Sequence, residues 1–532
     1  MRQCLTSDLG GYYTSTALSD SDQFGSKGDF VTSPEISQIF GELIGVWIVA
    51  EWIAQGRKTE GVCLMEMGPG RGTLMDDVLR TVRNFPPLAK AIEAVYLVEA
   101  SQNLRLAQHK LLCGDTPLLR NDLGFESTSK HSKDLRIIWT EDIRFVPRTT
   151  DKAPFIIAHE FFDALPIHVF QSVLPNPQQA DNAAQSQSTA LGQVDSTASS
   201  PGWTKDEIAR LAQLRVDQGL NWEEVAKQLQ RSILDVRAKY YELSMPNKAS
   251  EAVPRRSASG KSQGNQWREL VVSPKPPHRL KEDEPEFELT KSRAGTPHSM
   301  YLPETSARYR ALKDIDGATI EISPESQAYA RDFAIRLGGL NPQEATKGSA
   351  VTPVTARTVS SAPSEEAFLK REPSGAALII DYGPASTIPA NSLRGIKQHR
   401  RVSPFLSPGT TDVSADVDFL ALAESAINAS PGVEVHGPVE QGRFLTAMGI
   451  EERAAQLVKQ AVDRERGGST GQDKAELTEL VKRIESGWKR LVDRGPQGMG
   501  RLYQVMAITP YKPAKEGQPR RRPVGFGGDI TV

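Results

Sequence analysis

Residues 62–73, VCLMEMGPGRGT, constrain the fold of this chain more than any other stretch. Val62–Met67 is a largely apolar run of strand length, and a glycine-rich turn follows it directly. From Leu74 to Val82, apolar residues recur at the spacing of one helix face. A strand, a glycine turn and a helix form the opening unit of an α/β sheet, and ligands bind such sheets where the strand ends beside the helix. An ordinary turn that binds no ligand is the alternative.

The spacing of the glycines separates the candidate cofactors. Gly68, Gly70 and Gly72 give the pattern Gly-x-Gly-x-Gly, whereas a dinucleotide fingerprint places its third glycine one residue later. Glycines allow unusual backbone angles and let a ligand approach the main chain closely. With Glu66 near the end of the strand, the turn is similar to the first motif of S-adenosylmethionine-dependent methyltransferases, and these residues are expected to bind the cofactor.

Two further residues suit a cofactor that contains adenosine and a carboxylate. A second apolar run, Ala94–Val98, ends in Glu99, and a carboxylate at that position can accept both ribose hydroxyls. A solvated strand end is the alternative reading of Glu99. Arg71, inside the glycine turn, is expected to contact the cofactor carboxylate, with an ordinary surface arginine as the alternative.

Further short apolar runs alternate with helical patterns, which predicts an α/β fold with a mostly parallel, doubly wound, Rossmann-like sheet. Ile137–Trp139 and Phe155–Ala158 are expected strands, and Tyr503–Ile508 is expected as an antiparallel edge strand. Ser33 is expected to be the N-cap of a helix. The preceding loop, Asp29–Ser33, has no core pattern and is a candidate for closing over a ligand.

Carboxylates at the expected strand ends are candidates for chemistry on a cationic acceptor. These residues are Asp142, Glu160, Asp163 and Asp381, of which Asp142 is assigned to cofactor binding. Glu160 and Asp163 flank two phenylalanines on one short loop, which combines negative charge with aromatic walls. Carboxylates can hold a cationic acceptor, and a carboxylate can also be the base that takes its proton. Glu160 and Asp163 are therefore the catalytic candidates, with helix capping as the alternative role.

Seven motifs occur in one order along the chain: GYYTS, GDFVTSPEISQIFGELIGVW, EMGPGRGTLMDDVLR, VEAS, HEFFDALPIHVF, IIDYG and SPGTTDVSADVDF. Together they closely resemble the arginine methyltransferase family that assists assembly of mitochondrial respiratory complex I. The resemblance implies S-adenosyl-L-methionine as the cofactor and symmetric dimethylarginine on a complex I core subunit as the product. It also implies a location in the mitochondrial matrix.

The resemblance covers three core segments, and the remaining residues are additions. The expected division is core at 1–173, 267–340 and 375–510, an insertion at 174–266, a disordered linker at 341–374 and a mobile tail at 511–532. Ile167–Val173 and Trp267–Val272 are expected to pair as strands around the insertion. A hairpin tip tolerates such an insertion because the cost of loop closure grows slowly with length.

Within the insertion, residues 202–243 resemble a Myb/SANT repeat, with Trp203, Trp222 and Tyr241 spaced 19 residues apart. In that fold the third helix can enter a DNA groove. Residues 203–243, however, hold seven basic and seven acidic side chains, whereas a DNA reader normally carries a basic face. Nucleic-acid binding is therefore not favoured over a protein-interaction module. A chromatin- or DNA-associated protein and a methyltransferase with a different acceptor stay open as alternative functions.

Composition argues against several other classes. The 64 basic and 66 acidic residues give a net charge of −2, which provides no global attraction to nucleic acid or anionic membranes. The three cysteines are scattered, so neither a metal site nor a disulfide framework is expected. No run of 18 apolar residues exists, and no membrane span is expected. Because the first residues do not read as a presequence, further upstream residues are expected to supply one.

Overall fold

The computed structural model describes residues 1–7, 10–14, 28–174, 264–281, 284–340, 368, 370–465, 471–513 and 521–527, with a few positions between 207 and 231. The chain divides into two compact units, Met1–Val173 with Asn265–Val532, and Leu174–Gly264. Most of the Myb/SANT-like segment and of the linker expected at 341–374 lies outside the described residues. In the second unit, the guanidinium of Arg231 pairs with the carboxylate of Glu207 at 3.0 Å.

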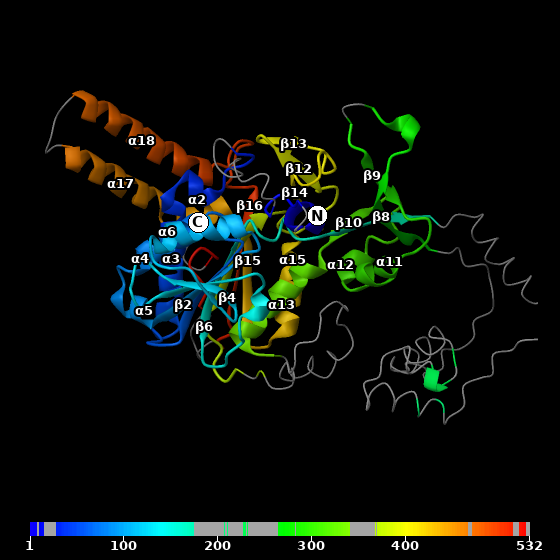
Figure 1. Cartoon of the computed structure of the whole chain (residues 1–532), viewed down its shortest axis with the longest axis horizontal. Coiled ribbons are helices and arrows are strands. Elements are labelled where there is room, and N and C mark those ends of the chain that lie inside the picture. Colours follow the sequence, from blue (N-terminus) through cyan, green and yellow to red (C-terminus); the bar gives the residue numbers. More distant parts are fainter. Residues whose placement is uncertain are drawn as a thin grey trace, which may run out of the picture. The chain divides into compact units, whose positions relative to one another are not determined.

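A nine-stranded sheet forms the centre of the first unit (Figure 1). Its strands, in spatial order, are β15 (Val433–Glu440), β16 (Tyr503–Pro510), β11 (Ala376–Tyr382), β6 (Ala153–His159), β1 (Val62–Met67), β2 (Ile92–Val98), β5 (Arg136–Thr140), β4 (Gly124–Thr128) and β3 (Leu119–Asn121). The five strands from β11 to β5 run parallel, and the outer strands pair antiparallel. The predicted doubly wound α/β fold is therefore confirmed, with antiparallel additions at both sides.

Helices cover both faces of this sheet. One face packs against α3 (Gln38–Ala54), α4 (Thr73–Val82), α5 (Pro86–Ala91), α6 (Gln102–Cys113), α16 (Gln441–Ala447), α17 (Ile450–Glu465) and α18 (Gly471–Val492). The other face packs against α13 (Pro324–Gly338) and α15 (Phe419–Ala429). Every residue of β1 is buried, which is why this strand reads as a continuous apolar run rather than as an alternating one.

Two sequence-based expectations need correction. Tyr503–Ile508 belongs to an antiparallel strand as predicted, but it is not at the edge, because β15 pairs along its outer side. The helix expected from Ser33 is two helices, α2 (Ser33–Ile36) and α3, with Ser37 capping the second by accepting from the amide of Ile39. The N-cap of α2 is Thr32, which forms a capping box with Glu35.

Two smaller sheets and short helices complete the first unit. The second sheet has the order β10 (Thr319–Ile322), β7 (His168–Val173), β8 (Gln266–Pro274) and β9 (Phe287–Lys291). The third has the order β13 (Arg400–Val402), β12 (Arg394–Lys397) and β14 (Asp412–Ser414). The remaining helices are α1 (Arg2–Thr6), α11 (Pro297–Tyr301), α12 (Ala307–Arg310), η2 (Ile143–Phe145), η4 (Pro277–Arg279) and η5 (Leu302–Glu304). The antiparallel pairing of β7 with β8 across the insertion agrees with the predicted hairpin.

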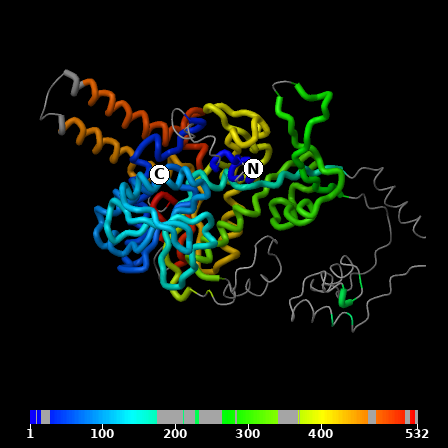
Figure 2. The backbone as a smooth tube through the Cα atoms, viewed as in Figure 1, coloured from blue at the N-terminus to red at the C-terminus, as the bar shows by residue number. Residues whose placement is uncertain are grey.

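The N-terminal residues fold back onto a distant part of the chain. Leu5 and Tyr12 are buried against Val413, and Figure 2 traces the N-terminal backbone beside this later segment. At the other end, Phe526 is buried against Phe444. Among the described residues, no helix has the length and apolar character needed to cross a bilayer.

Candidate functional site

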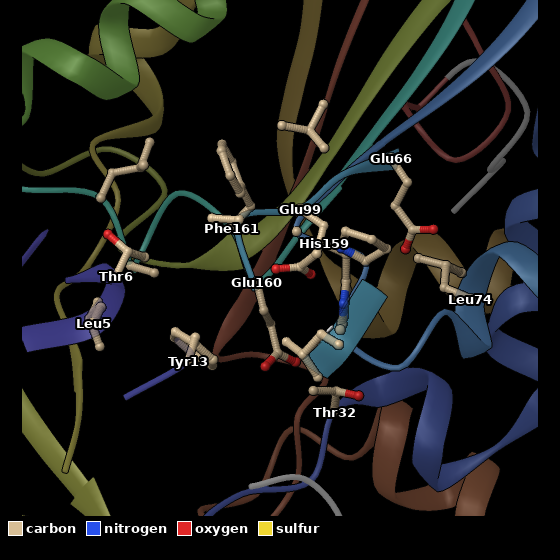
Figure 3. A pocket seen from close by; sticks show the side chains of 18 of the residues that line it. Leu5, Thr6, Tyr13, Thr32, Glu66, Leu74, Glu99, His159, Glu160 and Phe161 are labelled. Atoms are coloured by element: carbon tan, nitrogen blue, oxygen red, sulfur yellow. Dashed lines mark ion pairs between the residues drawn. The ribbon is translucent and has the colours of Figure 1, made fainter. Parts of the chain in front are cut away.

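A cavity of about 310 Å³ opens where the parallel strands β1, β2, β5 and β6 end (Figure 3). Its walls come from the glycine turn, the residues after β2, β5 and β6, and the N-terminal segment. The lining residues that the sequence predicted are Glu66, Gly68, Gly70, Arg71, Glu99, Asp142 and Glu160. This position follows from topology, because the carboxyl ends of parallel strands meet at one edge of a sheet.

The glycine turn has backbone angles that residues with a side chain rarely adopt. Gly68, Gly70 and Gly72 have φ angles of 59°, 54° and 85°, which lie in the left-handed region. A Cβ atom on Gly68 would lie 3.1 Å from a ring carbon of Phe161, and one on Gly72 would lie 3.3 Å from the side chain of Gln108. The turn therefore keeps the main chain bare beside the cavity and starts α4 directly behind it.

Glu66 and Glu99 form an acidic pair on the same side of the cavity. Glu66 is almost fully buried, and no described residue offers a hydrogen bond to its Oε2. Burial, reinforced by the charge of Glu99, raises the pKa of Glu66 well above its usual value. Burial likewise raises the pKa of Glu99 to about 7. Two buried carboxyls beside an open cavity favour a ligand that donates hydrogen bonds.

Gln108 fixes this side of the cavity and was missed by sequence reasoning. Its Nε2 donates to the carbonyl of Gly70 at 2.6 Å and to Oε2 of Glu99 at 3.0 Å. Its Oε1 accepts from the indole of Trp139 at 3.0 Å. One fully buried amide thus links the glycine turn to the ends of β2 and β5. Its only sequence signal is a polar residue within the helix that follows Glu99.

Arg71 and Asp142 line the cavity but already have charged neighbours. Arg71 lies 3.4 Å from Oε1 of Glu35. Asp142 caps η2 by accepting from the amide of Arg144 at 2.8 Å, and it also pairs with that guanidinium. The structure therefore brings both predicted residues to the site, with Glu35 and Arg144 as partners that the sequence did not indicate.

The loop after β6 holds the two catalytic candidates, and Asp381 shapes it. Oδ2 of Asp381 accepts from the amides of Phe161 at 3.1 Å, Phe162 at 2.8 Å and Asp163 at 3.4 Å. Glu160, at the start of the loop, has a φ angle of 49°, which is uncommon for a residue with a side chain. The fully buried Asp381 thus uses its side chain to hold the backbone of this loop. The sequence had suggested it as one of the carboxylates that could bind a cationic acceptor.

Glu160 is the predicted carboxylate that reaches the cavity on the side away from Glu66. In Figure 3 its side chain extends toward Tyr13 and Thr32, whereas Glu66 lies beside Leu74. The hydroxyl of Tyr503 donates to Oε1 of Glu160 at 2.8 Å and also contacts the hydroxyl of Tyr382. Burial, reinforced by the charge of Asp163, raises the pKa of Glu160 to about 8. A raised pKa keeps the carboxyl group of Glu160 largely neutral until a ligand binds. A cation bound beside it would favour the ionised form.

His159 contributes no positive charge to Glu160, although its Nε2 lies 3.5 Å from Oε1 of that residue. Burial lowers the pKa of His159 to about 3, so the imidazole is neutral at physiological pH. Within the described part of the chain, the imidazole beside Glu160 therefore leaves its carboxyl group without a positive charge to pair with.

Asp163 lies behind the loop rather than in the cavity. Among the described residues that line the cavity, Glu160, Phe161, Ala164, Leu165 and Pro166 come from this loop and Asp163 does not. Burial raises the pKa of Asp163 to about 6, while the charge of Arg394 opposes this shift. The structure thus separates the two catalytic candidates: Glu160 is positioned to touch a ligand, and Asp163 is positioned to act on Glu160 through its charge.

The N-terminal residues cover the cavity, and sequence reasoning had selected only the Asp29–Ser33 loop among them. Leu5, Tyr13, Phe30 and Thr32 contribute to its wall. The hydroxyl of Tyr13 donates to Oδ1 of Asp412 at 3.0 Å, which ties the segment to β14. Phe30 and Thr32 belong to the Asp29–Ser33 loop that was expected to close over a ligand. Their positions are in agreement with that expectation.

The two halves of the cavity fit S-adenosyl-L-methionine beside a second ligand. The half formed by Glu66, Glu99 and the glycine turn offers an unpaired buried carboxylate oxygen and a bare backbone, which suit the hydroxyls and the close approach of an adenosine group. Arg71 lies at the same turn, where a guanidinium suits the carboxylate of that cofactor. The half around Glu160 lies apart from these residues.

Comparisons with known proteins bear on this assignment. A family model described as "Putative S-adenosyl-L-methionine-dependent methyltransferase" matches residues 43–439. A rat protein named "Protein arginine methyltransferase NDUFAF7, mitochondrial" is 27% identical over 519 residues, covering 96% of this chain and 80% of the relative. The Drosophila melanogaster homologue is 28% identical over 512 residues, covering 96% of this chain and 80% of the relative. The Xenopus laevis protein is 44% identical over 183 residues, covering 32% of this chain and 38% of its own.

A solved structure shares the fold. It is described as a "likely methyl transferase from Burkholderia thailandensis bound to S-adenosyl-homocysteine", with a TM-score of 0.52 and 17% sequence identity. The similarity covers 96% of this chain and 86% of that chain.

Proposed function

Because this chain belongs to the family of S-adenosyl-L-methionine-dependent methyltransferases that its sequence matches, we propose that it methylates arginine side chains of a protein and that Glu160 holds the target guanidinium. S-adenosyl-L-methionine is its cofactor. The relatives named as mitochondrial arginine methyltransferases align along 96% of the chain, which supports the choice of acceptor.

The position of Glu160 is the observation that carries this proposal. The carboxyl group lies at the cavity, and burial together with the nearby Asp163 makes it a poor anion in the ligand-free protein. Asp381 and Asp412 are also buried within this region, and Arg394 is the cation that faces Asp163. Bringing a guanidinium into the cavity would compensate for this excess of acidic groups, because an opposite charge favours the ionised form of each carboxyl.

The residues around the cavity can perform the steps that this chemistry needs. When bound, the cofactor supplies an electrophilic methyl group on a sulfonium. Glu160 accepts hydrogen bonds from the guanidinium and holds at its Oε2 the proton that leaves the target nitrogen. Tyr503 occupies Oε1 and so fixes the direction in which Oε2 points. Phe161, with its ring packed edge-on against Tyr329, supplies an aromatic wall beside the site.

We further propose the product, the substrate and the location that the family resemblance implies. The product is symmetric dimethylarginine, the substrate is a core subunit of respiratory complex I, and the enzyme acts in the mitochondrial matrix to support assembly of that complex. The core segments 1–173, 267–340 and 375–510 carry the activity, and the insertion at 174–266 is an accessory module. These statements rest on the seven ordered motifs and on the names of the relatives.

Mass spectrometry of arginine methylation in purified complex I tests this function. Cells with and without the protein would be compared, and the lost modification would be assigned as symmetric or asymmetric from its fragment ions. Loss of symmetric dimethylarginine from one core subunit, restored by the wild-type protein but not by Glu160→Gln, is the expected result. Unchanged methylation of every complex I arginine would remove this substrate, and an asymmetric product would overturn the proposed product.

A further inference from the structure

A group of metal-ligating side chains lies on the second sheet, away from the cavity. His168 begins β7, Glu269 lies in β8 and His298 lies in α11. Nδ1 of His168 is 2.8 Å from Oε1 of Glu269, and Nδ1 of His298 is 3.7 Å from the same oxygen. Among the described residues, one ligand atom from each of the three lies within 4.8 Å of the other two.

Glu269 is held in a fixed orientation that leaves one oxygen for both imidazoles. Glu269 is only 8% exposed, and its Oε2 accepts a hydrogen bond from the hydroxyl of Thr296 at 2.5 Å. Thr296 is itself fixed as the N-cap of α11, where its side chain accepts from the amide of Ser299 at 3.0 Å. In metal sites, too, a second group often donates a hydrogen bond to the ligating carboxylate and so orients it.

From these contacts we propose that His168, Glu269 and His298 bind a zinc ion. Imidazole nitrogens and carboxylate oxygens are zinc ligands with bonds of about 2.0–2.2 Å, so neighbouring ligand atoms around a tetrahedral ion lie roughly 3.3 Å apart. The two separations from Oε1 of Glu269, 2.8 Å and 3.7 Å, lie on either side of this spacing. The side chain of His298 is 57% exposed and has room to rotate toward the ion. Water takes the fourth position.

A simple ion pair between His168 and Glu269 explains less of the geometry. Such a pair needs one imidazole, whereas here two imidazoles face one carboxylate oxygen with ring centroids 4.2 Å apart. Two protonated imidazoles at this separation would repel each other. If both imidazoles are neutral and their Nδ1 atoms bind a zinc ion, this repulsion does not arise. The carboxylate of Glu269 is then the third ligand of the same ion.

The site has a consequence for the loop that holds Glu160. His168 follows Pro166, a residue of the cavity wall, after one intervening position. A bound ion would add α11 to the contact that already exists between the start of β7 and β8, next to the end of this loop. Zinc would therefore stabilise one end of the loop without touching either ligand of the cavity.

Metal titration of the full-length protein tests the site without cofactor or substrate. The protein is stripped with a chelator and titrated with zinc against a chromophoric competitor, and cobalt(II) is then added as a spectroscopic probe. We expect one zinc ion per chain and the visible absorption of a tetrahedral cobalt(II) centre. His298→Ala and Glu269→Gln should each weaken binding by roughly 10-fold or more.

His278→Ala is the matched control, because His278 is an exposed histidine in the same part of the fold. It should retain wild-type zinc affinity. Because His298 is largely exposed, its replacement should leave the fold intact, which circular dichroism would check. Equal zinc affinity in wild type, His298→Ala and His278→Ala, or the absence of any zinc binding by the folded wild type, would overturn the proposal.

Discussion

The hydroxyl of Tyr503 donates a 2.8 Å hydrogen bond to Oε1 of Glu160, across 343 positions of sequence. Tyr503 begins β16, which is antiparallel to β11, and β11 lies between β16 and the strand that leads into Glu160. The contact therefore depends on the order of three neighbouring strands. Through this contact β16 helps to orient an acid at the cavity and lowers its pKa.

Tyr503→Phe should shift the pH dependence of methylation. The proposed mechanism needs Glu160 as a carboxylate, and its pKa is about 8, so kcat/KM should fall as the pH drops below about 8. The hydrogen bond from Tyr503 lowers the pKa of Glu160. Removing it should move the inflection of the pH profile upward by about one pH unit, because a hydrogen bond to a charged group contributes about 1.5–3 kcal/mol.

Tyr309→Phe is a matched control for this experiment. Tyr309 is also buried and its hydroxyl donates to a carboxylate, that of Asp418 at 3.0 Å, but it does not contact Glu160. The control should leave the inflection unchanged. A profile that is identical in wild type and Tyr503→Phe would show that the hydrogen bond does not govern the titrating acid.

Glu160→Gln and Asp163→Asn should have different effects on catalysis. Glu160→Gln removes the base and should lower kcat roughly 100-fold or more, with little change in cofactor affinity. Asp163→Asn leaves the carboxylate at the cavity but removes a charge that raises its pKa, so the inflection in kcat/KM should move to lower pH. Steady-state kinetics across pH, with calorimetry of cofactor binding, would measure both effects. Equal losses in both variants without a pH shift would contradict the separate roles.

Gly70→Val should abolish binding of S-adenosyl-L-methionine. Gly70 has a φ angle of 54° and lies at the cavity, so a branched side chain would both strain the backbone and occupy the space beside it. Gly317→Val is the control for backbone strain alone, since Gly317 has a φ angle of 76° and a Cβ atom there would meet nothing within 4 Å. Calorimetry on the two folded variants should show a loss of cofactor affinity in Gly70→Val and wild-type affinity in Gly317→Val. Wild-type affinity in Gly70→Val would reject this placement of the cofactor.

Replacing residues 175–264 with Asn-Gly should preserve cofactor binding. Val173 pairs with Gln266 in the antiparallel ladder of β7 and β8, so a short hairpin connection can close the gap. The removed residues form almost the whole of the second compact unit. Calorimetry should give a cofactor affinity close to that of the full chain. A folded deletion variant that no longer binds cofactor would show that the insertion belongs to the catalytic core.

The residues that the sequence predicted well carry a local signal. The bounds of β1 coincide with the run Val62–Met67, because a strand that is buried on both faces is apolar at nearly every position, with Glu66 as the exception here. Glu66, Glu99 and Glu160 were found because each stands at or next to the end of such a run. Position along one strand was enough, since parallel strands bring their carboxyl ends together.

The residues that the sequence missed depend on contacts between distant segments. β15 has the sequence VEVHGPVE, whose polar residues conceal the strand that covers the outer side of β16. Tyr13 and Tyr382 reach the site from opposite parts of the chain, and no short motif joins them. Asp163 looked equivalent to Glu160 in sequence, but the backbone bonds to Asp381 turn the loop so that only one of the two carboxylates faces the cavity.

The support that Asp381 gives to the loop of Glu160 also has a consequence for biosynthesis. Every predicted cofactor-binding residue, from Glu66 to Asp142, leaves the ribosome more than two hundred positions before Asp381, and Tyr503 follows later still. A nascent chain can thus present the glycine turn while the acceptor loop still lacks its anchor. Copies that end before Asp381 would keep the glycine turn and Glu99 but would lack the side chain that fixes the loop of Glu160.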